Sequence, residues 1–449
     1  MQATAARRVA KSIATICASF LLLSLFFVQL RYVGMTAGLL PVQKAEASVV
    51  ARAPHFDGSG TVSVEYCSEV VAGHDADNPS GLTSTNLAFD DAWLERDSFA
   101  YQHQLATACS VLAAVCNSES QFYGGVEGAK PYAELALGAL GFDDVRTDSY
   151  ALRSGILDEI GALFAGSHDV AAYTLASKTV PGKKGEPPTT ILFVGIRGSY
   201  GIEWLSNFNF MNPVDADHQG FKAAEREIEE ALFDYARERG ADPAHTRVLV
   251  TGHSRGGAIA NLLAARLDNL DGSPQQLAPA RNVFAYTFAA PCATKTPDRQ
   301  AASYGNVFNI VNESDIVPQL PLSIWGYGRY GTNVVLPDAS SATFAATLDD
   351  MQDAYRRNTG MEYRPNEGAL DSLVSFEAEA ARNVPDVDSL ASPAGIFGAL
   401  QTLAGLDCIA AIDAHCPDTY IAWMQATDPG NLTFRSAHAT APGALQAVA

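Results

Sequence analysis

The segment 247–267, RVLVTGHSRGGAIANLLAARL, constrains the fold of this chain more than any other stretch. It passes from an apolar run through a glycine-rich turn to a run whose apolar side chains recur at helical spacing. Residues 248–250 are typical of a buried strand. The helical positions after the turn are Ile259, Leu262, Leu263 and Leu267. The segment therefore predicts a strand, a tight turn and a helix, with Ser254 at the bend.

Gly252 and Gly256 bracket Ser254 in the pattern G-x-S-x-G. In a nucleophile elbow such glycines are needed because a strained turn has no room for a Cβ beside the serine. The helix that follows directs its unpaired N–H groups at any negative charge that develops there. Ser254 is therefore a candidate nucleophile. The alternative is a glycine turn that only joins two packed elements.

Length and composition favour a single large α/β domain. A chain of 449 residues, 47% of them apolar, can bury such a core together with a substantial insertion, and we favour this over two domains. Apolar runs alternate with amphipathic segments, which predicts a mostly parallel sheet flanked by helices. Fifty acidic against thirty basic residues give a formal charge of −20, which disfavours contact with nucleic acid or anionic lipid. Any contact with a lipid interface should be apolar.

The first 47 residues are typical of an export signal or an N-terminal membrane anchor. Arg7, Arg8 and Lys11 precede an apolar stretch at 13–30, and Ala-Glu-Ala at 45–47 offers a cleavage site. The basic flank predicts that the remaining chain lies outside the cytoplasm, secreted or associated with the cell envelope. Disulfides are permitted there, and Cys408 and Cys416 could close a loop. No histidine and cysteine cluster suggests a metal site, and no motif requires a cofactor.

The remaining chain divides into segments of different character. We interpret 48–87 as an N-terminal arm with one strand at 61–66, 88–428 as the main domain, 340–405 as a helical insertion within it, and 429–449 as a loosely ordered tail. Helices are expected at 99–116, 133–140, 152–164 and 219–239, and strands at 282–288 and 306–311. Residues 170–178 and 190–197 flank a Pro/Gly/Lys turn and predict a hairpin. The insertion should contain helices from 342 to 359, 371 to 382 and 395 to 403.

A nucleophilic serine needs a base and a group that orients the base, and in the α/β-hydrolase arrangement these follow in the order acid, then histidine. Asp315 comes directly after an apolar strand, where active sites on such sheets lie, with Glu313 as a competing carboxylate. His415 and His438 are the histidines that follow. His415 is favoured, because it lies between an apolar segment and an aromatic one, whereas His438 lies in the tail.

An oxyanion formed at Ser254 needs two donors. One is the backbone N–H of the following residue, Arg255. The strand ILFVGI leads into Arg-Gly-Ser at 197–199, so Ser199 is the candidate for the second donor. The alternative for 197–199 is a plain turn.

Together these residues resemble the class 3 lipases, the fungal-type family of α/β-hydrolases. IRGSYGIEWLSNF is similar to the family's oxyanion segment, HQGFKAA to a helix start, VTGHSRGGAIA to the elbow, FNIVNESDIVPQLP to the acid loop and HCPDTY to the base segment. The resemblance runs patchily over 88–335 and 408–425. It assigns Ser254 as nucleophile, Asp315 as acid, His415 as base, and Ser199 with Arg255 as oxyanion donors.

The resemblance also implies a fold and an activity. It implies an α/β-hydrolase fold and an exported serine hydrolase that cleaves lipid esters through an acyl-enzyme, without a cofactor or metal. The chain departs from the family pattern at Arg255 and Ile196, where leucine and phenylalanine are usual, and in the insertion between acid and base. Alternatives are a short-chain esterase, thioesterase or phospholipase at the same site, or a non-catalytic envelope-associated binding protein. The natural ester and the oligomeric state are not indicated.

Overall fold

A computed structural model of the chain describes residues 56–75, 77–78, 80–123, 130–148, 171–183, 185–198, 216–321, 323–337, 342–363, 379, 382 and 413–436. Several predictions fall outside them: the export segment 1–47, the helix at 152–164, Ser199, Cys408, His438 and the insertion helix at 395–403. Of the insertion helix at 371–382, only residues 379 and 382 are described, and both are helical. No helix in the described part of the chain is long and apolar enough to cross a membrane.

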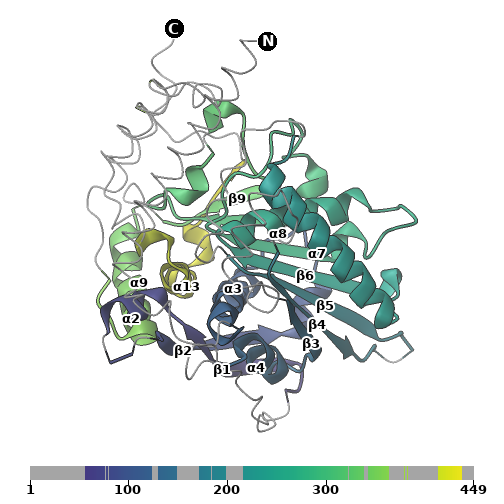
Figure 1. The fold of residues 1–449 in the computed structure, drawn as a ribbon, viewed down its shortest axis with the longest axis horizontal. Helices are drawn as coiled ribbons and strands as arrows, with labels where there is room; N and C mark the ends of the chain where they lie inside the picture. The colour runs from purple at the N-terminus through teal and green to yellow at the C-terminus, as the bar shows by residue number, and fades with distance from the viewer. Residues whose placement is uncertain are drawn as a thin grey trace, which may run out of the picture.

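A sheet of eight described strands forms the centre of the molecule, in the order β10-β9-β8-β7-β6-β5-β4-β3 (Figure 1). In chain order its strands are β3 (Asp143–Asp148), β4 (Tyr173–Val180), β5 (Thr189–Ile196), β6 (Thr246–His253), β7 (Val283–Phe288), β8 (Val307–Val311), β9 (Thr332–Val335) and β10 (Thr433–Ser436). Strands β5 to β9 are parallel. At the edges, β3, β4 and β10 pair antiparallel. The mostly parallel sheet is confirmed, and β4 and β5 form the expected hairpin.

Helices cover both faces of this sheet, because side chains of a buried strand point alternately to either side. In β6, Val248 and Val250 belong to the cluster packed under α7 (Gln219–Glu238) and α8 (Arg255–Asn269). Leu249, between them, belongs to the cluster on the opposite face. That face is covered by α3 (His103–Tyr123), α4 (Tyr132–Ala139), α9 (Phe344–Thr359) and α13 (Pro417–Ala426). Figure 1 shows these helices on the two sides of the sheet.

Part of the predicted N-terminal arm belongs to the hydrophobic core. Strand β1 (Ser59–Cys67) covers the strand expected at 61–66 and pairs antiparallel with β2 (Leu82–Asp90). The side chains that this hairpin buries alternate along its strands, at Val64, Tyr66, Leu87 and Phe89. They join the cluster that contains α3. A short helix, α2 (Glu69–His74), connects the two strands.

The predicted tail and the predicted insertion each contribute an element to the packed fold. Residues 433–436, in the predicted loose tail, form edge strand β10 on β9. At the start of the predicted insertion, α9 ends at Thr359 and Gly360 adopts the left-handed conformation with φ 73°, as expected for a glycine after a helix. Helix α9 packs against α13 and β2, so this first part of the insertion covers the same face as the hairpin.

Candidate active site

Ser254 lies between β6 and α8 in a backbone conformation with positive φ (φ 57°, ψ −127°) that residues other than glycine rarely adopt. The close approach of α8 to the sheet explains the two glycines. A Cβ on Gly256 would overlap the carbonyl oxygen of Ile196 in β5, and a Cβ on Gly252 would overlap that of Gly256. The Ser254 N–H donates to the carbonyl of Phe288 in β7 at 2.9 Å. The local sequence thus forms the predicted elbow.

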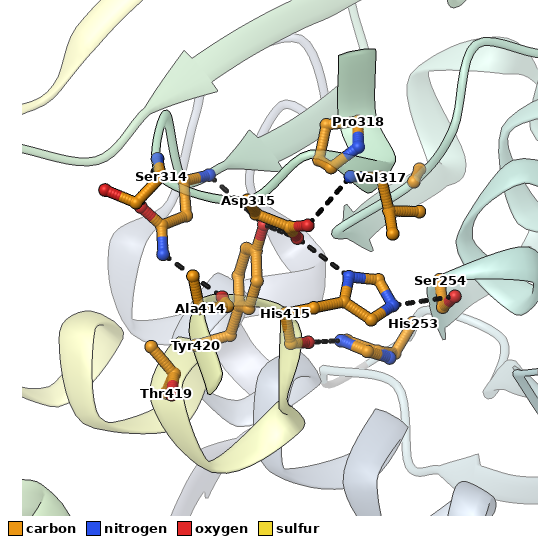
Figure 2. A network of polar contacts seen from close by, with 12 residues as sticks. His253, Ser254, Ser314, Asp315, Val317, Pro318, Ala414, His415, Thr419 and Tyr420 are labelled. Carbon is orange, nitrogen blue, oxygen red and sulfur yellow. Dashed lines mark hydrogen bonds and ion pairs between the residues drawn. The ribbon is translucent and has the colours of Figure 1, made fainter. Parts of the chain in front are cut away.

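The structure brings Ser254, His415 and Asp315 into one hydrogen-bonded chain (Figure 2). His415 Nε2 lies 3.0 Å from Ser254 Oγ, and His415 Nδ1 lies 2.8 Å from Asp315 Oδ2. Asp315 is fully buried, in the loop after β8, and Ser254 is 6% exposed. The competing carboxylate, Glu313, forms an ion pair with Arg435 of β10 instead. A carboxylate, an imidazole and a hydroxyl in this order can remove the proton of the hydroxyl.

Asp315 accepts two further hydrogen bonds besides that of His415. The backbone N–H of Val317 donates to Oδ1 at 2.9 Å, and the Tyr420 hydroxyl donates to Oδ2 at 2.8 Å. Tyr420 in turn accepts from the backbone N–H of Asn312 at 3.2 Å. Burial, and then the charge of Asp315, raise the pKa of Tyr420 well above its usual value, so the hydroxyl keeps its proton. These donors hold the carboxylate of Asp315 ready to orient the imidazole.

The loop that carries His415 is fixed through three consecutive carbonyl groups. Thr419 Oγ1 donates to the carbonyl of Asp413 at 2.7 Å. Asn312 Nδ2 donates to that of Ala414 at 3.1 Å, and His253 Nε2 to that of His415 at 2.8 Å (Figure 2). The donors come from α13, from the acid loop and from the elbow. His415 is therefore held by both of the segments that carry Ser254 and Asp315.

His253 is a residue that the sequence reasoning did not single out, although it precedes Ser254 in the elbow motif. Its ring centroid lies 4.8 Å from that of His415. A carbonyl only accepts hydrogen bonds, so His253 Nε2 must carry a proton. Burial, and then the neighbouring His415, lower the pKa of His253 well below its usual value. His253 therefore acts as a neutral donor to the backbone of the base.

Of the two predicted oxyanion donors, one lies in the described part of the chain. Arg255 is the first residue of α8, where backbone N–H groups have no partner within the helix. Ser199 lies outside the described residues, but the preceding Gly198 is close to the elbow, since a Cβ on it would lie 3.0 Å from the carbonyl oxygen of His253. The N–H of Gly198 donates to Asn117 Oδ1 at 2.7 Å. Asn117, on α3, is another contact that the sequence did not indicate.

No group of three or more His, Cys, Asp or Glu side chains among the described residues could hold a metal ion. Cys416, which directly follows His415, is buried. The disulfide to Cys408 stays a prediction, because Cys408 lies outside the described part.

Comparison with known proteins agrees with this architecture. Residues 193–325, which include the second half of β5, the elbow and the acid loop, match the family model of class 3 lipases. This segment is similar to the class 3 lipases, and the mostly parallel sheet flanked by helices is the architecture that an α/β-hydrolase fold predicts.

Two curated relatives are fungal enzymes. A lipase of Rhizomucor miehei is 29% identical over 205 residues, which are 43% of this chain and 53% of that protein. The secreted mono- and diacylglycerol lipase A of Penicillium cyclopium is 24% identical over 222 residues, 46% of this chain and 68% of that protein. The chain thus spans about half of the Rhizomucor lipase and about two thirds of the Penicillium enzyme. A solved complex of Rhizomucor miehei lipase with its propeptide matches with a TM-score of 0.36 and 22% identity over 54% of this chain and 71% of that one.

Proposed function

We propose that this protein is a serine hydrolase that cleaves the carboxylic ester bonds of acylglycerols or related lipid esters. The observation that carries the proposal is the hydrogen-bonded chain from Asp315 through His415 to Ser254 at a strained elbow. The matched relatives, a lipase and a mono- and diacylglycerol lipase, support lipid esters as the substrate class. No cofactor is needed for this chemistry.

In the proposed reaction, Ser254 Oγ attacks the ester carbonyl carbon while His415 Nε2 takes the hydroxyl proton. Asp315 stabilises the imidazolium of His415 that results. The negative oxygen of the tetrahedral intermediate accepts hydrogen bonds from the backbone N–H of Arg255 and from Ser199. His415 then gives its proton to the leaving alcohol, and the acyl group stays on Ser254. Water, deprotonated by His415, releases the acid and restores the free serine.

The direct test is hydrolysis of chromogenic esters by the wild type and by Ser254→Ala. We expect the substitution to reduce kcat by about 10⁴-fold or more, because it removes the nucleophile. Ser273→Ala, in the loop after α8, is the matched control and should hydrolyse at the wild-type rate. Activity of Ser254→Ala close to that of the wild type would overturn the mechanism.

A chain-length series separates the lipid-ester hydrolase from a short-chain esterase on the same residues. Rates are measured with acyl esters of increasing length, below and above the solubility limit of each. A lipase should prefer long chains and gain rate once an insoluble interface is present, since the strongly acidic chain can meet that interface only through apolar contacts. Preference for short, dissolved esters with no gain at the interface favours the esterase.

We also propose that the protein acts outside the cytoplasm, on the basis of its N-terminal segment and of the Penicillium relative, whose name describes it as secreted. N-terminal sequencing of the released protein should find a start at Ser48. Material that stays on the membrane and starts at Met1 would instead identify the segment as an anchor.

A further inference from the structure

Asp418, three residues after His415, is a buried carboxylate that the triad does not use. It lies in the first turn of α13 and is 1% exposed. Its Oδ1 accepts from the Tyr66 hydroxyl at 2.7 Å, and its Oδ2 accepts from Ser68 Oγ at 2.9 Å. Both donors belong to the N-terminal hairpin, about 350 residues earlier in the chain. Asp418 thus joins the helix that follows the base to a distant part of the core.

The two donors are themselves held firmly. Tyr66 is 1% exposed and its backbone pairs with Thr83 of β2. The N–H of Ser68 donates to the carbonyl of Gly81 at 2.8 Å, and its side chain accepts from the N–H of Val71 at 3.1 Å, which caps α2. A Cβ on Gly81 would overlap the carbonyl oxygen of Ser68, so the chain is closely packed at this point. The packed hairpin therefore holds in place the two hydroxyl groups that donate to Asp418.

A charged group at this place has an energetic cost that an apolar residue would avoid. Burial raises the pKa of Asp418, while the hydrogen bonds of Tyr66 and Ser68 lower it. Among the described residues no ion pair involves Asp418. The positive end of α13 and the two hydroxyl groups are what favour its charge. A buried polar group of this kind fixes one geometry, because any displacement would leave the carboxylate oxygens without their hydrogen-bond donors.

The contact completes the support of the His415 loop. Side chains of the acid loop and the elbow hold the carbonyls of Ala414 and His415 from one side. On the helix itself, Tyr420 reaches Asp315. Asp418 lies between His415 and Tyr420 in the chain, and the hairpin holds it independently of the acid loop and the elbow. The segment 414–420 is therefore tied to three separate elements of the fold: the acid loop, the elbow and the hairpin.

We propose that Asp418 is a positioning residue, through which Tyr66 and Ser68 of the N-terminal hairpin hold His415 at its distance from Ser254. The hairpin lies outside the matched segment 193–325, so this support extends the active site to a part of the chain that the family match does not cover. The inference rests on the proposed hydrolase function. A local shift of the start of α13 moves the imidazole of His415 away from Ser254, and this slows proton transfer without changing substrate binding.

The test uses the full chain with Asp418→Asn and Tyr66→Phe, which keep size and remove the carboxylate or the hydroxyl donor. We expect kcat for a soluble ester to fall by about 10- to 100-fold, since small misplacements of a catalytic group have effects of this size. KM should stay within about twofold, and labelling of Ser254 by a fluorophosphonate should slow by the same factor as kcat. Glu65→Gln is the matched control, because it breaks only the ion pair of the same strand with Lys130 and should leave kcat unchanged.

The double variant shows whether Tyr66 and Asp418 act through one contact. If they do, Tyr66→Phe with Asp418→Asn should lose no more than the more impaired single variant, instead of the product of the two losses. Thermal unfolding of each variant gives the folded fraction at the assay temperature. If Asp418→Asn does not fold, Tyr66→Phe carries the test.

The outcomes separate this inference from the proposed function. The positioning role alone is overturned if the wild-type protein is labelled at Ser254 and the folded variants Tyr66→Phe and Asp418→Asn keep the wild-type kcat and labelling rate. A loss that disappears when kcat is expressed per folded molecule overturns it as well. Wild-type protein that is folded but neither labelled at Ser254 nor active overturns both proposals.

Discussion

The carboxylate of Asp315 is the most densely bonded side chain of the site. It accepts from His415, from Tyr420 and from the N–H of Val317, and it is fully buried. A buried carboxylate needs such donors to stay charged. Because the imidazole and the phenol share Oδ2, the position of Tyr420 also defines where Nδ1 of His415 can lie. Asp315 thus contacts His415 directly, and Tyr420 fixes the carboxylate oxygen that the two donors share.

Replacing Tyr420 with phenylalanine tests this arrangement. The variant removes one donor of Asp315 and the acceptor of the Asn312 N–H, and a hydrogen bond to a charged group contributes about 1.5–3 kcal/mol. We expect kcat to fall by about tenfold or more with little change in KM. Tyr304→Phe, which removes a hydroxyl bonded to Asn269 far from the triad, should leave kcat unchanged. Equal activity of Tyr420→Phe and wild type would show that the hydroxyl does not support the acid.

At this scale the sequence indicated the candidate triad but not the residues that support it. Ser254 could be located because the elbow is a local pattern, and Asp315 because it follows a strand end. Tyr420 and His253 could not be assigned roles, since each bonds a group more than a hundred residues away. Such contacts depend on how the elements pack, and no spacing along one chain reveals them.

At the scale of elements, the packing of α8 on the strand ends decides whether the elbow can form. Gly256, in the first turn of α8, faces the carbonyl of Ile196 at the end of β5 with no room for a Cβ. The helix and strand therefore meet at backbone contact distance. This closeness puts the first turn of α8 beside the chain that continues from β5 towards Ser199.

Gly256→Ala should accordingly be destabilising. We expect a loss of about 2 kcal/mol or more in the free energy of unfolding, because backbone on both sides has to move, and a loss of activity in the folded fraction. Gly138→Ala is the control: a Cβ at Gly138, inside α4, meets nothing within 4 Å. That variant should be unchanged or up to about 1 kcal/mol more stable, since alanine favours helix. Urea denaturation measures both, and equal effects of the two substitutions would contradict the packing argument.

The end of α8 carries a pH-sensitive contact. Asp268 is 6% exposed, accepts from Asn306 Nδ2 at 2.9 Å, and its burial raises the pKa of its carboxyl group to about 8. The unfolded value is about 3.9, so the folded state binds the extra proton between these values. The stability that this group contributes is full below about pH 4 and is lost as the pH rises to about 8, by up to about 1.4 kcal/mol per pH unit.

Asp268→Asn isolates this effect, because asparagine resembles the protonated acid. The free energies of unfolding of variant and wild type should be similar at pH 5, and the variant should become progressively the more stable of the two towards pH 8. Urea denaturation at several pH values gives the difference. A difference that does not depend on pH would mean that Asp268 is ionised in the folded protein throughout.

At the scale of the whole molecule, the N-terminal hairpin is joined to the main sheet by a buried ion pair. Lys178 of β4 pairs with Asp91, directly after β2, and its side chain is 5% exposed. Its ammonium group also lies over the rings of Phe89 and Phe142, 4.9 and 4.6 Å from their centroids. Burial lowers the pKa of Lys178, and Asp91 raises it in compensation. The hairpin thus supplies the counter-charge of a residue inside the sheet.

Removing that counter-charge with Asp91→Ala leaves a buried lysine unpaired. We expect a loss of about 3 kcal/mol in the free energy of unfolding. Glu95→Ala, a few residues further, breaks an exposed pair with Lys183 and should cost less than about 1 kcal/mol. Thermal and urea unfolding compare the two. If Glu95→Ala proves as destabilising as Asp91→Ala, burial of the pair does not matter.

A segment of the fold could be predicted from the sequence only where its own residues form a pattern typical of a strand or a helix. The strands at the centre of the sheet could be predicted, because each is a short apolar run between turns. Edge strand β3, with the sequence DDVRTD, could not, since it is polar and is held by pairing with β4. The close packing of the arm and the pairing of strand β10 could not be predicted for a similar reason, because both depend on contacts with residues distant in the chain.

In the proposed mechanism, Ser254 is a nucleophile activated by His415 and Asp315. This claim is tested most directly by treating the folded protein with a fluorophosphonate and mapping the modified peptide by mass spectrometry. We predict one probe per molecule, on Ser254, with ester hydrolysis lost in proportion and with His415→Ala almost unlabelled. Folded protein that takes up no probe, or that loses hydrolysis through labelling of another serine, would contradict the claim.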